Sequence, residues 1–587
     1  MIGLVIFTLL AAFVGRLMLG LLRNRRIARA TGLPCVLFPV SEFNVIYQML
    51  FENSTFLYVV NNRLPQWLAD YITGSTYRGR WTAKDRPCKR YGKSRKSSKP
   101  VEVFLNLSKY IVSSIVPCTS VELTVYIGKA GLDLFGPNVV VSEYQEWAHH
   151  RHHTAPPFNE KNNVLVWQEA IRVSTEMIEH WRNLHSERSS PTEFIVPNTR
   201  EDILKLTLYV LCSAGFGVKL PFQNAVEATM ADTKALFRDA QLPPPGYQFT
   251  FRAVMEYLNT NLISIFFANG VIPQWVPRWM LPFCKTDFYA YDDLVKYFRE
   301  LVSSADTSKL STPNLLEEMV RSQLYNDKGQ ERGLSDQEIQ GNMFIFVIAG
   351  HETTATALRF ALVLLAIDQE TQDWVSKDIL EAIHPEPVEQ AKWDYNALFP
   401  KLVAPLCVML ETLRLYPPVV TVPKWTGGSP AEIVYDGQHY LLPAHTGVNL
   451  NAVPLHYASE YWGPTALDFD PSRWDKRNTQ SYLAENGDMD GLTAPGLEYS
   501  TIHKPIRGAY FPFADGNRAC LGKKFAQTEF VVTLAVIFRE YQVKLARNKD
   551  ETQEAALQRA KKILNESSSL ITLAMRDAVP LQFVKRR

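Results

Sequence analysis

The stretch FPFADGNRACLG, residues 511–522, decides the fold of this 587-residue chain. It holds one cysteine, Cys520, in a glycine-containing loop, and the apolar run KKFAQTEFVVTLAVIF, residues 523–538, follows directly. This order predicts a loop that leads into a buried helix, with Cys520 at the helix N-terminus. Unpaired backbone N–H groups and partial positive charge at such a terminus favour a thiolate, which is a metal ligand. The alternative is that Cys520 is a small buried apolar residue, the common role of a free cysteine.

Three neighbours of Cys520 suit a flat and bulky cofactor. Gly516 and Gly522 would let the backbone pass close to such a group without a Cβ clash. Arg518 would pair with one of the acidic groups of the cofactor. The loop therefore predicts a cofactor site built around a cysteine ligand.

The composition is that of an ordinary globular protein, with 46% apolar and 21% charged residues. The 62 basic and 60 acidic residues nearly balance, which argues against nucleic acid as a partner. The seven cysteines are scattered and form no CxxC pair, so neither a disulfide scaffold nor a zinc ribbon is expected. Because no repeat or flexible linker divides the chain, we expect one large catalytic domain over residues 41–587.

The first 22 residues, MIGLVIFTLLAAFVGRLMLGLL, form an apolar run that only Arg16 interrupts. As a helix they would span roughly 33 Å, which is enough to cross a bilayer. Four arginines follow the run: Arg23, Arg25, Arg26 and Arg29. We therefore expect a single-pass anchor at 1–22 and a basic, proline-containing hinge at 23–40, with the remaining chain on the cytoplasmic side. A cleaved signal peptide and a shorter interfacial insertion are the alternatives.

Helices outnumber strands in the rest of the pattern, so the fold class is mainly α with a minor β region. Apolar spacing of three and four predicts helices over 162–185 and 199–218. Residues 341–367 are apolar on every side and predict a helix through the protein centre, with a polar HETT step midway. Short β-branched runs follow over 432–451, where Asp436-Gly437 marks a hairpin.

The segment 222–283 is rich in aromatics and prolines and predicts two helices joined by irregular, apolar turns. Such a segment is either a peripheral subdomain or the roof of a lipophilic pocket, and the sequence favours neither.

The pattern Phe513-x-x-Gly516-x-Arg518-x-Cys520-x-Gly522 resembles the haem-binding signature of the cytochrome P450 family. The resemblance implies a P450-like fold that binds haem b, with Cys520 as the axial ligand of the iron. It also implies that the other four positions of the pattern bind the cofactor.

The resemblance extends to residues 349–353, AGHET, which match the family pattern [AG]-G-x-[DE]-T in the expected central helix. It implies that Glu352 and Thr353 are catalytic and deliver protons while the thiolate supplies electron density for O–O cleavage. Gly350 would leave room for dioxygen, and the Thr353 hydroxyl can bond to the carbonyl one turn earlier and open the helix. A zinc-protease HExxH motif fails because residue 355 is alanine.

A second family motif, Glu411-x-x-Arg414, is followed by LYPPV as in the family. The two side chains share a helix face and are expected to form a buried ion pair. The resemblance implies that Arg473, in the later stretch FDPSRW, joins the pair. These three residues would brace the haem side of the protein without taking part in the reaction.

Trp147 and Arg151 lie four residues apart, which places both on one helix face. The resemblance implies that they reach a haem propionate, and it gives Lys424 a similar role. A metal site is the alternative for the neighbouring histidines, although no carboxylate or cysteine accompanies them at matching spacing. These histidines are His149, His150, His152 and His153.

The function implied by the resemblance is that of a haem-thiolate monooxygenase, which uses O2 to oxidise a lipophilic small molecule. No flavin- or NAD-binding fingerprint is present, so electrons from NADPH would come through a separate NADPH–cytochrome P450 reductase. An acidic donor of this kind could dock at Lys523 and Lys524. With the anchor, this predicts an endoplasmic reticulum enzyme whose catalytic domain faces the cytoplasm. Candidate pocket residues are Phe346, Ala349, Val419 and Val420.

The phrase APPFNEKNN, residues 155–163, resembles fungal members of the family that act in secondary metabolism. Other functions stay open: a haem-thiolate isomerase or dehydratase that needs no O2, a fatty-acid or xenobiotic hydroxylase, or an inactive haem-binding remnant. The intact pair Glu352 and Thr353 argues against the isomerase.

Residues 88–131 are atypical, because this stretch is basic where the family has paired strands. Our hypothesis is that 105–129 are translated intron, and a lineage-specific, membrane-facing insertion is the alternative.

Overall fold

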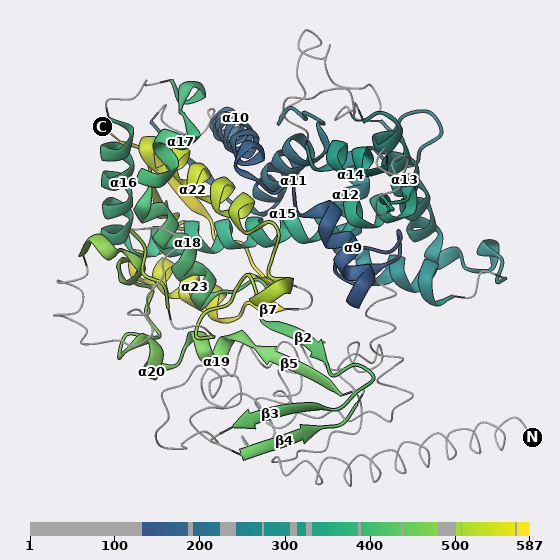
Figure 1. Ribbon diagram of the computed structural model, residues 1–587. Helices are drawn as coiled ribbons and strands as arrows, with labels where there is room; N and C mark the ends of the chain where they lie inside the picture. Colours follow the sequence, from purple (N-terminus) through teal and green to yellow (C-terminus); the bar gives the residue numbers. More distant parts are fainter. Residues whose placement is uncertain are drawn as a thin grey trace, which may run out of the picture. The chain divides into compact units, whose positions relative to one another are not determined.

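The structure is a computed structural model (Figure 1). It describes residues 132–185, 192–222, 237, 242–272, 275–305, 314–323, 332–384, 389–435, 438–444, 446–478, 501–505, 508–569 and 572–586. The predicted anchor, the hinge and the atypical segment 88–131 lie outside this set. Among the described residues, no helix combines the length and the apolar character needed to span a bilayer.

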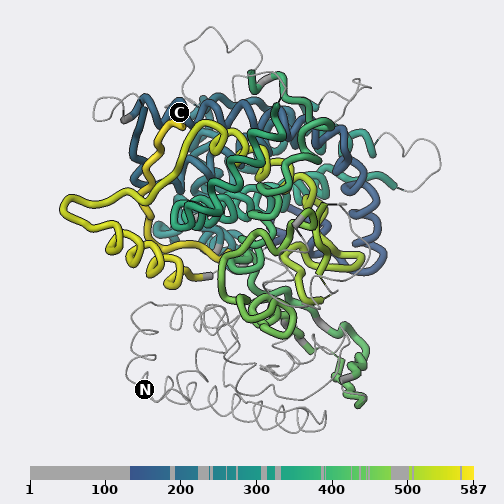
Figure 2. The backbone as a smooth tube through the Cα atoms, turned by 90° about the vertical axis from the view of Figure 1, so that its left-hand side faces the viewer, coloured from purple at the N-terminus to yellow at the C-terminus, as the bar shows by residue number. Residues whose placement is uncertain are grey.

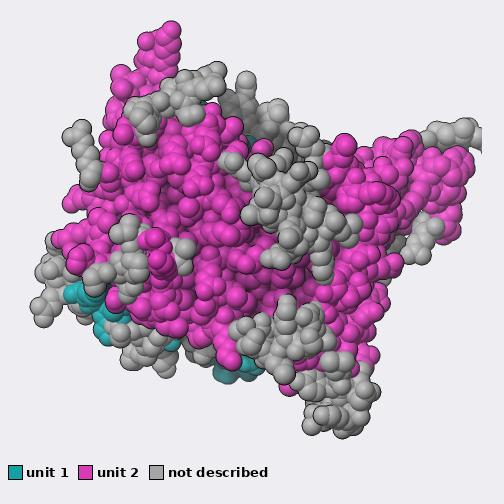
Figure 3. All heavy atoms as spheres, turned by 90° about the horizontal axis from the view of Figure 1, so that it is seen from above, with its two compact units in different colours: residues 1–128, 410–519, 562–576 teal, residues 129–409, 520–561, 577–587 magenta. Residues whose placement is uncertain are grey.

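The chain divides into two compact units, which Figure 3 colours separately. Unit 1 contains residues 410–519 and 562–576 together with 1–128, and unit 2 contains residues 129–409, 520–561 and 577–587. The predicted site residues are shared between the units, because the boundary falls between Ala519 and Cys520. Each unit is therefore described by itself.

Unit 2 is mainly helical, as its apolar periodicity predicts. Its helices are α9 (Tyr144–Thr154), α10 (Glu160–His185), α11 (Arg200–Phe216), α12 (Phe251–Phe266), α13 (Lys285–Ser303), α14 (Leu315–Gln323), α15 (Asp336–Ile367), α16 (Gln369–Ile383), α17 (Tyr395–Leu398) and α22 (Lys523–Glu540). The helices α18 (Val403–Leu415) and α23 (Gln553–Asn565) begin in this unit. Short turns η4 (Phe267–Val271), η5 (Arg278–Met280) and η6 (Pro282–Cys284) join α12 to α13.

Helix α15 is the core of unit 2. It packs along α11, and α10 packs on both α11 and α22 (Figure 1). The helix begins at Asp336, five residues before the predicted start, because Ser335 and Glu338 form a capping box ahead of the apolar run. Most of its side chains are buried on all sides, as expected for a central helix.

A three-stranded antiparallel sheet completes unit 2, in the order β1-β9-β6. Its strands are β1 (Glu193–Val196), β6 (Tyr541–Leu545) and β9 (Leu581–Lys585). The middle strand is thus the last one in the chain, and Figure 2 shows the yellow C-terminal end beside the blue early part of the unit. Phe583 of β9 stacks on Phe194 of β1, with ring centroids 5.2 Å apart. This aromatic pair helps to fix the register.

Unit 1 holds short helices and three two-stranded sheets among its described residues. The helices are α19 (Ala452–His456) and α20 (Ser459–Trp462), and the strands are β2 (Thr421–Trp425), β3 (Ala431–Tyr435), β4 (Gln438–Leu442), β5 (Gly447–Asn451), β7 (Ser568–Ser569) and β8 (Leu573–Ala574). Strand β3 pairs antiparallel with β4, and β2 with β5. The predicted hairpin is therefore confirmed, although Asp436 and Gly437 themselves lie outside the described residues. The mainly α class with a minor β region is also confirmed.

Candidate active site

Cys520 differs from the other described cysteines. Cys212, Cys284 and Cys407 are buried, whereas Cys520 is exposed, so its role is not that of a small core residue. It lies just before α22, whose N-cap is Gly522. Cys520 keeps exposed surface, but the protein packed around its sulfur still raises the pKa of the thiol by desolvation, while the Gly522 backbone hydrogen bond and the charges of Arg151 and Lys523 oppose this rise. The loop thus offers a thiol with a backbone donor and a cation beside it.

Trp147 and Arg151 both lie on α9, half-buried. Arg151 is near enough to Cys520 for the two groups to affect each other's pKa, and burial lowers the pKa of the guanidinium. The helix face that the spacing predicts is therefore near the cysteine loop. This is the place from which a cation could meet an acidic group of a cofactor bound at Cys520.

A short stretch of α15 departs from the burial of the rest of the helix. Ala349 is exposed and Glu352 and Thr353 are half-buried, in the middle of a helix that is otherwise largely buried beyond its first turn. The Thr353 hydroxyl donates a hydrogen bond to the Ala349 carbonyl at 2.8 Å, the bond expected from the sequence. One face of the central helix therefore is left uncovered by protein at the residues that the AGHET pattern singles out.

Phe158 links this face to the cysteine loop, and the sequence analysis missed it. Its ring packs edge-on against Phe346 of α15, with centroids 5.5 Å apart. A Cβ added to Gly522 would lie 3.8 Å from the same ring. The only sequence signal for this role was the position of Phe158 in the APPF phrase, which does not reveal its partners.

Gly350 lies where α15 approaches α11. A Cβ at this position would lie 3.3 Å from the side chain of Leu211 on α11. The Thr207 hydroxyl of α11 also donates to the His351 carbonyl at 3.0 Å. Gly350 therefore permits the close approach of α11 and α15, and the expectation that it makes room for dioxygen stays a prediction.

In unit 1, Glu411 is the centre of a fully buried polar cluster. Its carboxylate accepts hydrogen bonds from Arg414 at 2.7 and 2.8 Å and from Arg473 at 3.0 Å. The Trp474 indole and the Asp470 backbone N–H also donate to it. Burial by itself raises the pKa of Glu411, but the two arginines outweigh it and lower the pKa to about 2. The ion pair and its third member are arranged as the two motifs suggested.

Within unit 1, His456 connects this cluster by hydrogen bonds to the start of the cysteine loop. Its Nε2 accepts from the Phe511 backbone N–H at 3.2 Å, so its Nδ1 carries the proton and donates to the Arg414 carbonyl at 3.1 Å. Farther along the loop, Ala514 and Gly516 take left-handed φ angles of 56° and 74°. Glycine suits the second position because of its positive φ and not because of crowding, since a Cβ there would meet open space.

The remaining predicted residues of unit 1 differ in their exposure. Phe513 and Arg518 are half-buried in the loop, and Lys424 is exposed on β2. Of the pocket candidates, Val420 is fully buried and Val419 is exposed.

The lysines that follow Cys520 belong to unit 2, and both are half-buried. Lys524 lies with its ammonium 4.3 Å from the centre of the Phe399 ring. One of the two lysines predicted to bind an electron donor therefore already contacts an aromatic ring of the protein.

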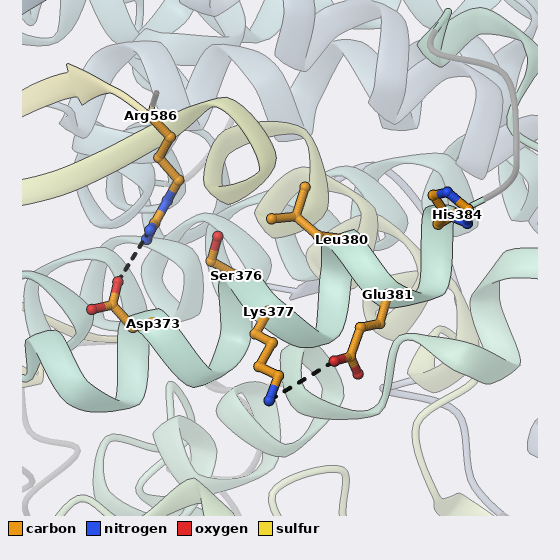
Figure 4. Close-up of a pocket in the computed structure, with 7 residues that line it drawn as sticks. All are labelled: Asp373, Ser376, Lys377, Leu380, Glu381, His384 and Arg586. Carbon is orange, nitrogen blue, oxygen red and sulfur yellow. Dashed lines mark hydrogen bonds and ion pairs between the residues drawn. The ribbon is translucent and has the colours of Figure 1, made fainter.

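A shallow depression on α16 holds none of the predicted site residues (Figure 4). There Arg586 reaches Asp373 at 3.0 Å, and Lys377 lies 3.9 Å from Glu381. Within the described part of the chain, no three histidine, cysteine or acidic side chains are placed to hold a metal ion. The α9 histidines therefore belong to no such cluster among these residues.

The residues of unit 2 fit a haem. An accessible thiol with a backbone donor and an arginine beside it suits a thiolate ligand, because each stabilises negative charge on sulfur. The uncovered face of α15 suits the small molecules that react at such a cofactor. The fold and these residues together define a class of thiolate-ligated haem proteins.

Comparison with known proteins agrees. The Cytochrome P450 family model matches residues 128–570. A cytochrome P450 monooxygenase of Arthrobotrys oligospora is 28% identical over 97% of this chain and 96% of that protein, and one of Penicillium rubens is 29% identical over 77% and 74%. A crystal structure of a cytochrome P450 covers 79% of this chain and 87% of its own at 18% identity, with a TM-score of 0.54, and shows the same fold. The chain belongs to the cytochrome P450 family and is a monooxygenase of that family.

Proposed function

We propose that this monooxygenase oxidises a lipophilic small molecule in fungal secondary metabolism, using a haem bound at Cys520. The observation that carries the proposal is the exposed thiol of Cys520, which lies beside Arg151 in the unit that also holds the uncovered face of α15. A relative from Leptosphaeria maculans, 24% identical over 94% of both chains, is named for the phomenoic acid biosynthesis cluster. That name supports the secondary-metabolic role.

When bound, the haem would supply dioxygen activation and take up electrons from a reductase. Cys520 would hold the iron, and the Gly522 N–H and the Arg151 charge would keep its sulfur ionised. Arg151 and Trp147 are the groups of unit 2 that we assign to the acidic edge of the cofactor, and for Arg518 and Lys424 this role rests on the family resemblance alone.

Thr353 would hold a proton at its Oγ1, and Glu352 in the same turn would supply the next one. The bond from Thr353 to the Ala349 carbonyl fixes the hydroxyl while it waits, because the donor has a definite acceptor at 2.8 Å. A positioned acid and hydroxyl of this kind typically contribute about 10²- to 10⁴-fold to the rate.

The helix face that would meet the substrate supports the lipophilic character that we propose for it. Phe346, Ala349 and Thr353 are spaced three and four residues apart, so they share one face of α15. The Phe346 ring packs with Phe158, and neither side chain offers a charge. Binding would therefore rest on removing apolar substrate surface from water.

Replacement of Cys520 by serine tests the proposal. The purified wild-type protein should give the thiolate-type spectrum after reduction and treatment with carbon monoxide, and it should consume NADPH only with a reductase and O2. Cys520→Ser should lose both properties, while Cys407→Ala, a change at a buried cysteine, should keep the spectrum in its folded fraction. A Cys520→Ser protein with the wild-type spectrum would contradict the proposal, and turnover without O2 would favour the isomerase.

We also propose that the enzyme works at a membrane surface. The predicted apolar run at residues 1–22 is one reason. A second is the turn region between α12 and α13, where Trp275, Trp279 and Phe283 are 82%, 79% and 73% exposed. Tryptophan is favoured at the membrane interface, so these side chains suit a lipid headgroup region. The endoplasmic reticulum, with the catalytic domain facing the cytoplasm, is the location that we assign.

A further inference from the structure

One histidine of α9 is enclosed where this helix meets the beginning of α15. His150 has no exposed surface, and its Nδ1 lies 2.9 Å from the side-chain Nδ2 of Asn342. It directly precedes Arg151, which lies near Cys520. The contact that holds His150 therefore also holds the position of Arg151.

The orientation of the Asn342 amide follows from two backbone groups. Its Oδ1 accepts from the Val139 N–H at 2.9 Å, and its Nδ2 donates to the Glu338 carbonyl at 2.8 Å. Turning the amide over would set two acceptors against each other at Glu338 and two donors at Val139. The second Nδ2 hydrogen is then the one that faces His150.

We propose that His150 is a positioning residue, fixed as the neutral tautomer with its proton on Nε2, which locks α9 and its Arg151 onto α15 through Asn342. Because Asn342 can only donate at this point, Nδ1 of His150 must accept. A proton on Nδ1 would break the contact.

Among the residues that the structure describes, no charged group near His150 lies within hydrogen-bond distance of its Nε2. Glu338 Oε1 lies 4.0 Å from Nε2, and the same carboxylate is already bound by Arg332 at 2.6 Å and by Ser335. Hydrogen bonds from Ser335 and the charge of Arg332 outweigh burial and hold the pKa of Glu338 below its usual value. Burial lowers the pKa of His150 to about 4. The charge of Glu338 acts to raise this pKa, and His149 and His153 act to lower it.

The same assignment bears on metal binding at the α9 histidines. His149 and His150 both turn an Nε2 toward Glu338 Oε1, at 3.9 and 4.0 Å. A metal at this point would need the lone pair of His150 Nε2, and the proton would have to move to Nδ1, against the Asn342 donor. The proposed tautomer therefore opposes metal binding by His150.

This inference rests on the proposed haem site, because the lock matters to function only if Arg151 meets the cofactor. The tautomer itself can be measured without haem. Selective ¹⁵N-histidine labelling of the full chain, with His150→Gln to assign one of twelve signals, should show Nε2–H for His150 from pH 5 to 8. Asn342→Asp, which places an acceptor at Nδ1, should move the proton to Nδ1. A wild-type signal with Nδ1–H, titration above pH 6, or a shift on adding Zn²⁺ would overturn the proposal.

A second experiment measures the positioning effect by the rate of haem transfer to apomyoglobin. His150→Leu removes the acceptor and should release haem about five- to tenfold faster, as expected for one lost buried hydrogen bond. His150→Gln supplies a carbonyl acceptor and should restore a rate within about twofold of wild type.

The control for this measurement is Trp181→Phe, which removes a 2.7 Å bond to Asp202 at another place in unit 2. It should lower stability without faster release. Equal release by the leucine, glutamine and wild-type proteins would overturn the positioning role. If the wild-type protein binds no haem at all, the proposed function fails while the tautomer result stands.

Discussion

Thr353 and Thr354 are neighbours in α15 with different surroundings. Thr353 is half-buried at the uncovered face of the helix, whereas Thr354 is buried and donates to the Gly350 carbonyl at 3.3 Å. The two threonines therefore form a matched pair: removal of the Thr353 hydroxyl is expected to affect proton delivery, and removal of the Thr354 hydroxyl is not.

We expect Thr353→Val to uncouple the reaction. Product formed per NADPH should fall about tenfold or more, because the hydroxyl proton is lost while electron uptake continues. Thr354→Val should keep the coupling and change mainly the unfolding temperature. Product and hydrogen peroxide measured against NADPH consumption test this, and equal coupling in all three proteins would remove Thr353 from the proton path.

At the residue scale, the sequence predicts roles that depend on near neighbours in the chain. Roles for Cys520 and Thr353 could be predicted because the residues within each motif lie only a few positions apart. The contacts of His150 with Asn342 and of Phe158 with Phe346 join positions almost 200 residues apart. No spacing rule within one element reveals such pairs, because they depend on how α9 and the loop after it meet α15.

At the scale of elements, Glu411 connects α18 to the segment that contains Arg473 and Trp474. We expect Glu411→Gln to lower the free energy of unfolding by about 3–5 kcal/mol, because it leaves two buried arginines without their carboxylate. Urea unfolding at pH 7 measures the loss. Glu318→Gln, which breaks the more exposed pair with Arg321 at 3.1 Å, should cost under about 1 kcal/mol.

The low pKa of Glu411 gives this element a pH dependence. Its folded-state pKa of about 2 lies below the unfolded value, so the stabilisation is present above about pH 4.5 and is lost as the pH falls toward 2. The wild-type protein should lose this contribution on acidification, and Glu411→Gln should not. Parallel stability curves for the two proteins below pH 4.5 would contradict the assignment.

Helix α15 also approaches the preceding chain closely at Gly341. A Cβ at this position would lie 2.4 Å from the carbonyl oxygens of Gly136 and Pro137, which are backbone atoms. Gly341→Ala should therefore destabilise the protein by about 1–3 kcal/mol through overpacking. Gly215→Ala on α11 would meet only side chains, at 3.3 Å or more, and helix propensity can offset the contact. Unfolding midpoints for both variants test the difference.

The helix boundaries show what local pattern can and cannot fix. The apolar spacing predicted α10 and α11 within a few residues, although α11 is buried on all sides from Leu206 to Phe216. The start of α15 was missed because Ser335 caps the helix ahead of its apolar run. The contact of Gly350 with Leu211 was not predicted, because Leu211 lies on another helix.

At the scale of the whole molecule, several buried histidines oppose protonation. Burial lowers the pKa of His150 and His351 to about 4 and that of His456 to about 3. These folded-state values lie below the unfolded one, so their stabilisation is full above about pH 6.5 and is lost as the pH falls toward 4. Each should contribute a slope of about 1.4 kcal/mol per pH unit near pH 5.

One buried carboxyl group, that of Glu529, has the opposite effect on the pH dependence of stability. Burial raises the pKa of Glu529 well above its usual value, so this residue favours the folded state at low pH. With three histidines against one carboxyl, we expect the free energy of unfolding to fall between pH 6.5 and 4. Denaturant unfolding at pH 7, 6 and 5 measures this, and a value that stays constant would refute the expectation.

The exposed tryptophans give the test of membrane contact. In vesicles that contain bromine-labelled lipids, the fluorescence of the full chain should be partly quenched. The double variant Trp275→Phe and Trp279→Phe should lose most of the quenched component, because these side chains are 82% and 79% exposed. Trp181→Phe, which changes a fully buried side chain, should retain it. Equal quenching in both variants would place this surface away from lipid.

The position of β9 has a consequence for synthesis of the protein. Residues 581–585 fill the space between β1 and β6, so a nascent chain that has not yet reached them carries two strands with open edges. Open edges pair readily with other chains. A premature stop or a frameshift ahead of residue 581 would therefore leave an aggregation-prone product that quality control should remove, even though Cys520 had already been translated.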